Sequence, residues 1–169
     1  TVGLAGYTNA GKSSLFHALS GKKVLVEDKL FSTLETTVGR MEMSPRILLA
    51  DTIGFIDELP SDLLDAFHAT LDESLRCDLL LLLADSSDET SELKRKLSTS
   101  RREVLDRNTV EALHMKVVLT KSDKGGDIEE AQEVVRTMGL PDALVVSSHI
   151  GQGLEAVSYT HLTLPTKRI

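Results

Sequence analysis

The sequence contains few cysteines, prolines and aromatic residues, and it has no tryptophan. Cys77 is the only cysteine among 169 residues, so an intrachain disulfide is impossible and the disulfide framework of small secreted domains is excluded. A reducing compartment fits this composition best, and we expect a cytoplasmic protein. The chain has 4 prolines and 11 glycines, which excludes a collagenous or low-complexity chain.

Long apolar runs and an excess of positive charge are also missing. The longest apolar run, from Leu79 to Ala84, is far shorter than the ~20 residues of a membrane-spanning helix, so we expect no membrane span. The formal net charge of −7 argues against nucleic acid binding through a broad basic surface. The chain is 41% hydrophobic and 27% charged, which is the composition of an ordinary globular domain.

Short runs rich in Val, Leu and Ile alternate with longer segments whose apolar residues recur at helical spacing. This alternation predicts an α/β fold, in which helices cover a mostly parallel sheet. Six strands are expected, at 1–5, 37–43, 46–50, 78–84, 115–119 and 143–146. Helices are expected at 12–19, after Ser61, at 89–107, between Asp127 and Gly139, and from 153 to 157.

The two ends of the sequence look incomplete. The first strand begins at residue 1, and the last predicted helix loses its periodicity after residue 157. We therefore expect one domain over 1–157, with its final helix incomplete. The tail 158–169 carries Thr, Leu and Pro165 where a closing amphipathic helix is expected, and it resembles translated adapter sequence rather than native chain.

A glycine-containing loop, Gly6-Tyr7-Thr8-Asn9-Ala10-Gly11-Lys12-Ser13, follows the first strand and precedes a helix. This spacing of two glycines, a lysine and a hydroxyl is the P-loop. Glycine lets backbone N–H groups turn toward phosphates, and the helix N-terminus adds partial positive charge. We expect Lys12 to contact the β- and γ-phosphates and Ser13 to bind Mg²⁺. The loop predicts the three-layer α/β/α sandwich of P-loop NTPases, as in small G proteins.

A second short motif, Asp51-Thr52-Ile53-Gly54, ends the third predicted strand. There Asp51 can hold Mg²⁺ through a water molecule, and the N–H of Gly54 can meet the γ-phosphate. Taken alone, this tetrapeptide is usually a simple turn. Its position after the P-loop favours the functional interpretation.

A third motif, Thr120-Lys121-Ser122-Asp123, ends the fifth predicted strand. Asp123 can accept hydrogen bonds from the N1–H and the 2-amino group of guanine, while the stem of Lys121 lies along the base. Adenine lacks this donor pair, and an unpaired buried carboxylate costs about 1–3 kcal/mol or more, so such a site rejects ATP. The run Ser147-Ser148-His149 resembles the last guanine-contacting loop of GTPases, whose backbone N–H groups meet the O6 atom.

The segment Phe31-Ser32-Thr33-Leu34-Glu35 occupies the place of switch I, between the first helix and the second strand. Its threonine completes the Mg²⁺ shell when GTP is bound, and we assign this role to Thr33 rather than to Thr36 or Thr37. Asn9 resembles the residue that lets some GTPases hold K⁺ beside the phosphates. The alternative, that Asn9 satisfies the backbone of its own loop, stays open.

Three runs carry a closer resemblance to one family. The run 26–35, the run Asp51-Thr52-Ile53-Gly54-Phe55-Ile56-Asp57-Glu58-Leu59-Pro60 and the run 63–73 resemble the HflX family over residues 1 to about 157. The resemblance implies a cytoplasmic, ribosome-associated GTPase that binds the large subunit and helps to split or rescue ribosomes. It also implies an N-terminal domain and linker helices ahead of this domain, and we expect those parts to be absent here. The sequence departs from the family pattern at Thr36, Gly39, Thr120 and Ser148.

Hydrolysis of GTP needs a positioned water and neutralisation of the phosphate charge, which Lys12, Thr33, Gly54 and Mg²⁺ can partly supply. Many GTPases place a glutamine directly after the glycine of the second motif, but this chain has Phe55 there. We therefore expect low intrinsic turnover and stimulation by the ribosome. The alternatives are another Obg- or Era-like GTPase, a GTP-sensing module with negligible hydrolysis, and a P-loop kinase or ATPase.

Overall fold

The computed structural model describes residues 1–21, 37–42, 44–51, 54, 62–107, 114–140 and 142–159. Strands and helices alternate along these residues, as the sequence pattern predicts. The strands are β1 (Val2–Gly6), β2 (Thr37–Met41), β3 (Ser44–Asp51), β4 (Leu79–Asp85), β5 (His114–Thr120) and β6 (Leu144–Val145). The helices are α1 (Lys12–Ser20), α2 (Leu64–Ser74), α3 (Thr90–Arg107), the short 3-10 helix η1 (Ser122–Lys124), α4 (Ile128–Thr137) and α5 (Leu154–Tyr159).

The six strands form one sheet in the order β2-β3-β1-β4-β5-β6. β2 runs antiparallel to β3, and every other neighbouring pair is parallel. β1 and β4 therefore lie inside the sheet, where both faces need cover, and both are buried along nearly their whole length. This arrangement confirms the predicted α/β fold with a mostly parallel six-stranded sheet.

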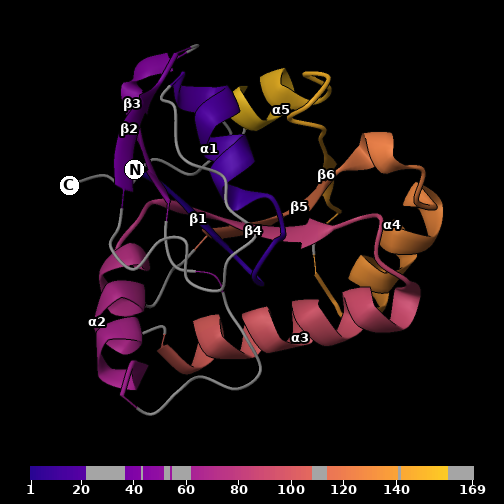
Figure 1. The fold of residues 1–169 in the computed structure, drawn as a ribbon, viewed down its shortest axis with the longest axis horizontal. Helices are drawn as coiled ribbons and strands as arrows, with labels where there is room; N and C mark the ends of the chain where they lie inside the picture. Colours follow the sequence, from indigo (N-terminus) through magenta and orange to yellow (C-terminus); the bar gives the residue numbers. More distant parts are fainter. Residues whose placement is uncertain are drawn as a thin grey trace.

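Helices cover both faces of the sheet, with α1 and α5 on one side and α2 and α3 on the other (Figure 1). Side chains alternate across a strand, so β4 serves both layers. Leu79, Leu81 and Leu83 join the core cluster that includes α1 and α5. The residues between them join the cluster that includes α2, α3 and α4. The predicted three-layer α/β/α sandwich is therefore confirmed.

Most element boundaries agree with the sequence patterns to within two residues. β2 ends at Met41 rather than at residue 43, because Met41 already pairs with Ser44 across the turn to β3. β6 contains only Leu144 and Val145, and α5 continues to Tyr159. Ser61, the expected cap of α2, lies outside the described residues, as do residues 160–169, so the domain boundary at 157 stays a prediction.

The start and end of α4 agree with the capping signals in the sequence. The Asp127 carboxylate accepts a hydrogen bond from the Glu130 N–H at 3.1 Å, which satisfies one of the amide groups left free in the first turn of a helix. Gly139 takes a positive φ of 73° directly after the helix, a conformation that glycine adopts without strain. Among the described residues, no helix is long and apolar enough to cross a membrane.

Candidate nucleotide-binding site

The P-loop leaves β1 and turns directly into α1. Gly6 lies so close to β4 that an added Cβ would sit 2.7 Å from the carbonyl oxygen of Leu83, so this strand end requires a glycine. Asn9 and Gly11 adopt left-handed backbone angles, with φ of 64° and 90°, and Gly11 is the N-cap residue of α1. The loop thus bends around the N-terminus of the helix, which is the geometry of a phosphate site.

Lys12 and Ser13, the first two residues of α1, meet the end of β3. The Lys12 Nζ lies 3.7 Å from Asp51 Oδ1, and the Ser13 hydroxyl donates to Asp51 Oδ2 at 3.3 Å. All three side chains are buried. Burial lowers the pKa of the Lys12 ammonium from its usual value, and the Asp51 carboxylate opposes this shift. The sequence-predicted phosphate and metal residues therefore converge.

The donor set at this point fits a magnesium ion. Mg²⁺ prefers oxygen ligands from hydroxyls, carboxylates and water, and the Ser13 hydroxyl and the Asp51 carboxylate lie in direct contact. Gly54 also lies at the P-loop, because a Cβ there would approach the Thr8 Cα to 3.1 Å. The other predicted contacts, 31–35, 52–53 and Phe55, lie outside the described residues.

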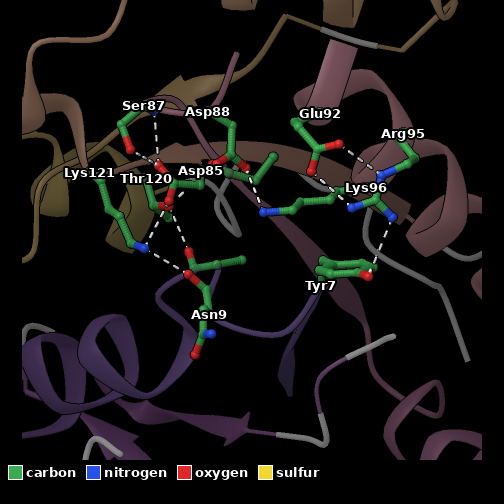
Figure 2. A network of polar contacts seen from close by, with 12 residues as sticks. Tyr7, Asn9, Asp85, Ser87, Asp88, Glu92, Arg95, Lys96, Thr120 and Lys121 are labelled. Carbon is green, nitrogen blue, oxygen red and sulfur yellow. Dashed lines mark hydrogen bonds and ion pairs between the residues drawn. The ribbon is translucent and has the colours of Figure 1, made fainter. Parts of the chain in front are cut away.

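The third motif joins the P-loop to the end of β5 (Figure 2). The Thr120 hydroxyl donates to the Ala10 carbonyl at 2.6 Å and lies 3.1 Å from the Ala84 carbonyl. The Lys121 ammonium donates to the Asn9 carbonyl at 2.7 Å and to Asp85 Oδ2 at 2.8 Å. Two consecutive side chains thus fix the phosphate loop relative to the segment that carries Asp123.

Asp123 lies beside the loop that follows β6. The Ser147 hydroxyl donates to Asp123 Oδ1 at 2.7 Å, and this hydrogen bond lowers the pKa of the Asp123 carboxyl below its usual value. The carboxylate is therefore ionised at neutral pH and acts only as an acceptor. An exposed acceptor of this kind suits a ligand that presents two neighbouring N–H donors.

A cavity of about 610 Å³ lies between the start of α1 and the third motif. Its lining includes the predicted residues Gly11, Lys121 and Asp123 together with Ser148 and His149. The sequence did not lead us to other lining residues on α1 and beyond Asp123. Those on α1 could have been found, because residues three and four positions apart after Gly11 share one face of the helix. These additional lining residues are Ser14, His17, Ala18 and Lys124.

The Tyr7 side chain of the P-loop lies beside Arg95 and Lys96 of α3 (Figure 2), and Tyr7 is not among the residues that line the cavity. The Arg95 guanidinium carbon and the Lys96 Nζ lie 5.4 Å and 5.5 Å from the Tyr7 ring centroid, within the range of cation–π attraction. Lys96 also pairs with Asp88 at 3.0 Å. The acidic residues after β4 are thus held by basic and hydroxyl groups, and the described residues contain no cluster of three metal-ligating side chains.

Comparison with known proteins identifies the family. The family described as 50S ribosome-binding GTPase matches residues 1–121. The chain is 44% identical to the GTPase HflX of Gluconacetobacter diazotrophicus over 161 residues, covering 94% of this chain and 34% of that protein. It is 36% identical to the GTPase HflX of Thermococcus kodakarensis, covering 97% of this chain and 40% of that one. The chain belongs to the HflX family of GTPases.

This HflX-type domain also resembles solved structures. A GTP-binding protein from Sulfolobus solfataricus, solved in complex with GDP, superposes with a TM-score of 0.77 at 28% identity, covering 96% of this chain and 51% of that one. The family match confirms the predicted HflX resemblance and the GTPase class. The HflX-type domain spans 34% to 40% of the length of the two curated relatives.

Proposed function

We propose that this domain binds GTP with Mg²⁺ in the cytoplasm, hydrolyses it slowly, and is stimulated by the large ribosomal subunit during ribosome splitting or rescue. The observation that supports it best is the single cavity of about 610 Å³ lined by both the P-loop helix and Asp123. Because Gly11 and α1 line this cavity together with Asp123, one nucleotide can place its phosphates at the P-loop and its base at Asp123.

The side chains divide the work of binding GTP between them. Lys12 would neutralise the β- and γ-phosphates, and Ser13 and Asp51 would hold the metal, Asp51 through water, with Thr33 as the switch I ligand. Bound Mg²⁺ would supply further positive charge on the phosphates. Gly54, which already lies against Thr8, would donate its N–H to the γ-phosphate.

Slow turnover follows from the residue after Gly54. The side chain of Phe55 has no hydrogen-bonding group, so it cannot orient a water molecule for in-line attack. Catalytic elements supplied in trans raise phosphoryl transfer by ~10³ to 10⁵. The family description names the 50S ribosomal subunit as the partner, and this supports a ribosome that orders the switch segments.

Release of phosphate from GTP tests the ribosome-stimulated hydrolysis. We expect low turnover by the protein alone and an increase of at least tenfold with purified 50S subunits, and no increase with 30S subunits. Lys12→Ala should remove both activities. Equal turnover with and without 50S subunits would refute the stimulation, and binding of GTP without turnover in either case would favour the GTP-sensing module.

Guanine specificity is tested by exchanging one carboxylate. Asp123→Asn presents one donor and one acceptor, which fits the 2-oxo group and N1–H of xanthine, so we expect the preference to move from GTP to XTP. Asp142→Asn is the matched control, because Asp142 pairs with the exposed Arg136 and does not line the cavity. Displacement of bound GDP by ATP as efficient as by GTP would favour the kinase or ATPase class.

We also propose that the Asn9 side chain holds K⁺ beside the phosphates. The main-chain carbonyl of Asn9 accepts a hydrogen bond from Lys121. Among the described residues, no hydrogen bond involves the side-chain amide of Asn9, and this residue is exposed. This weakens the alternative that Asn9 satisfies its own loop. Phosphate release should be faster in KCl than in NaCl at equal ionic strength, and Asn9→Ala should remove the difference. No difference in the unmodified protein would support the alternative.

A further inference from the structure

Two separate loops carry the predicted contacts to guanine, and one side chain joins them. Asp123 lies in the loop after β5, whereas Ser148 and His149 lie in the loop after β6. Gln152 closes the second loop, because its carbonyl accepts from the Ser147 N–H at 2.9 Å. Its side-chain oxygen, Oε1, accepts from the Ser122 hydroxyl at 2.8 Å. Gln152 therefore contacts both loops at once.

Gln152 lies between two glycines. Gly151 and Gly153 adopt left-handed φ angles of 76° and 75°, which other residues reach only with strain. Gly153 also lies against β6, since an added Cβ would overlap the Val145 carbonyl oxygen at 2.1 Å. The bridge to Ser147 and the close approach of Gly153 to Val145 hold the backbone at Gln152, whose side chain reaches Ser122.

The contact with Ser122 lies next to the specificity carboxylate. Ser122 directly precedes Asp123, and its N–H donates to the Val146 carbonyl at 3.1 Å. Asp123 itself accepts from Ser147, the residue that pairs with Gln152 in a short antiparallel bridge. Ser122, Asp123, Ser147 and Gln152 therefore form a closed ring of contacts between the two loops.

We propose that Gln152 is a positioning residue for guanine recognition, which sets the Asp123 carboxylate at a fixed distance from the Ser148 and His149 amides. This inference rests on the proposed function. Guanine requires that N1–H, the 2-amino group and O6 be satisfied together, so the spacing of the two loops decides the fit. Without the Ser122–Gln152 hydrogen bond, the contacts of Ser122 with Val146 and of Asp123 with Ser147 remain, but the spacing of the loops is less tightly held and Asp123 is less well aligned.

Binding of GDP and IDP to the full chain tests this inference. Hypoxanthine in IDP retains N1–H and O6 but lacks the 2-amino group, so the ratio of the two Kd values reports how well Asp123 is aligned. We expect Gln152→Ala to raise the Kd for GDP about threefold to tenfold, the effect of one lost hydrogen bond, and to raise the Kd for IDP less. The GDP preference over IDP should fall.

Ser122→Ala should have the same effect, and the double variant should be no weaker than either single variant. Ser122→Thr keeps the hydroxyl and should restore the preference. Gln132→Ala is the matched control, because Gln132 joins α4 to the Ala143 backbone through two hydrogen bonds away from the cavity. It should leave the GDP to IDP ratio unchanged even where it lowers stability.

The outcomes separate this inference from the proposed function. An unmodified protein that binds GDP and IDP equally would refute guanine recognition by Asp123, and this inference with it. An unmodified protein that prefers GDP, with variants that weaken GDP and IDP by the same factor, would refute only the positioning role of Gln152. Additive effects of Ser122→Ala and Gln152→Ala would also overturn it.

Discussion

At the scale of single residues, the ion pair between Asp85 and Lys121 connects the nucleotide site to the interior of the sheet. Burial alone would raise the pKa of Asp85, but hydrogen bonds from Lys121 and Ser87 outweigh it and hold the pKa below the usual 3.8. A carboxyl whose pKa is lower in the folded protein stabilises it above the unfolded value, and this contribution is lost as the pH falls through the folded value.

The Asp85 contribution to stability should therefore depend on pH. We expect Asp85→Asn to lower the free energy of unfolding by on the order of 1–2 kcal/mol at pH 7, and the difference from the unmodified protein should shrink as the pH falls below about 3.8. Urea titrations at a series of pH values measure both. A difference that stays constant down to pH 3 would contradict the pairing. Asp142→Asn, at an exposed pair, should change little.

Gly6 allows a second prediction at this scale, from steric contact alone. In Gly6→Ala the Cβ would lie 2.7 Å from the Leu83 carbonyl oxygen, so the end of β1 must move away from β4 and carry the P-loop with it. We expect a loss of about 1–3 kcal/mol of stability and at least a tenfold rise in the Kd for GDP, measured by fluorescence titration.

Gly139→Ala separates the loss of stability from the loss of GDP binding. Gly139 has a positive φ of 73°, but an added Cβ would meet no atom within 4 Å, and Gly139 does not line the cavity. Its replacement should lower stability and leave GDP binding intact. If Gly6→Ala also binds GDP normally, the close approach of β1 to β4 does not position the P-loop.

The sequence predicted which residues gather at the carboxyl edge of the sheet, but not all of their partners. Residues at the carboxyl ends of parallel strands share one edge of a sheet, so Asp51 and Asp123 could be placed at the site from their positions after strands. Asp85, for example, pairs with Lys121, and no motif in the sequence indicates this partner. That ion pair depends on the register between β4 and β5, which sets Asp85 opposite Thr120. The register cannot be read from a single sequence.

At the scale of elements, the N-terminal cap of α4 makes a local prediction. Asp127→Ala removes the acceptor of the Glu130 N–H, and the loss of such a cap typically costs about 1 kcal/mol. Urea unfolding should show this loss, whereas Asp127→Asn keeps a side-chain oxygen and should be close to the unmodified protein. GDP binding should not change, because Asp127 lies outside the cavity. Equal stability of the Ala and Asn variants would contradict the role of the cap.

The elements with the clearest apolar patterns in the sequence were also the best predicted. β4 is a continuous apolar run and α3 has a long amphipathic pattern, so burial dictates their extent. The bounds of β2 and β6 were predicted less accurately. β2 ends where the chain turns into β3, with a register shift after Arg40. β6 has two residues because it pairs only with Val118 and Leu119. Such limits come from pairing partners and not from local sequence.

At the scale of the whole molecule, the alternation of strands and helices predicted the layers but not the strand order. β1 lies between β3 and β4, so the P-loop leaves the sheet at its centre, with Asp51 and Asp85 at the ends of its two neighbours. The site thus collects residues from four strands and α1. Nucleotide binding should therefore stabilise the molecule as a unit.

This coupling can be measured by thermal unfolding. GDP at 100 times its Kd should stabilise the folded chain by about 2.7 kcal/mol, which for a domain of this size is a rise in Tm of roughly 5–10 °C. ATP should give no comparable rise, because Asp123 finds no donor pair on adenine. Lys12→Ala should reduce the shift, and removal of Mg²⁺ with EDTA should reduce the shift produced by GTP. An unchanged GTP shift in EDTA would contradict a metal held by Ser13 and Asp51, since the phosphate charge would then be balanced by the protein alone.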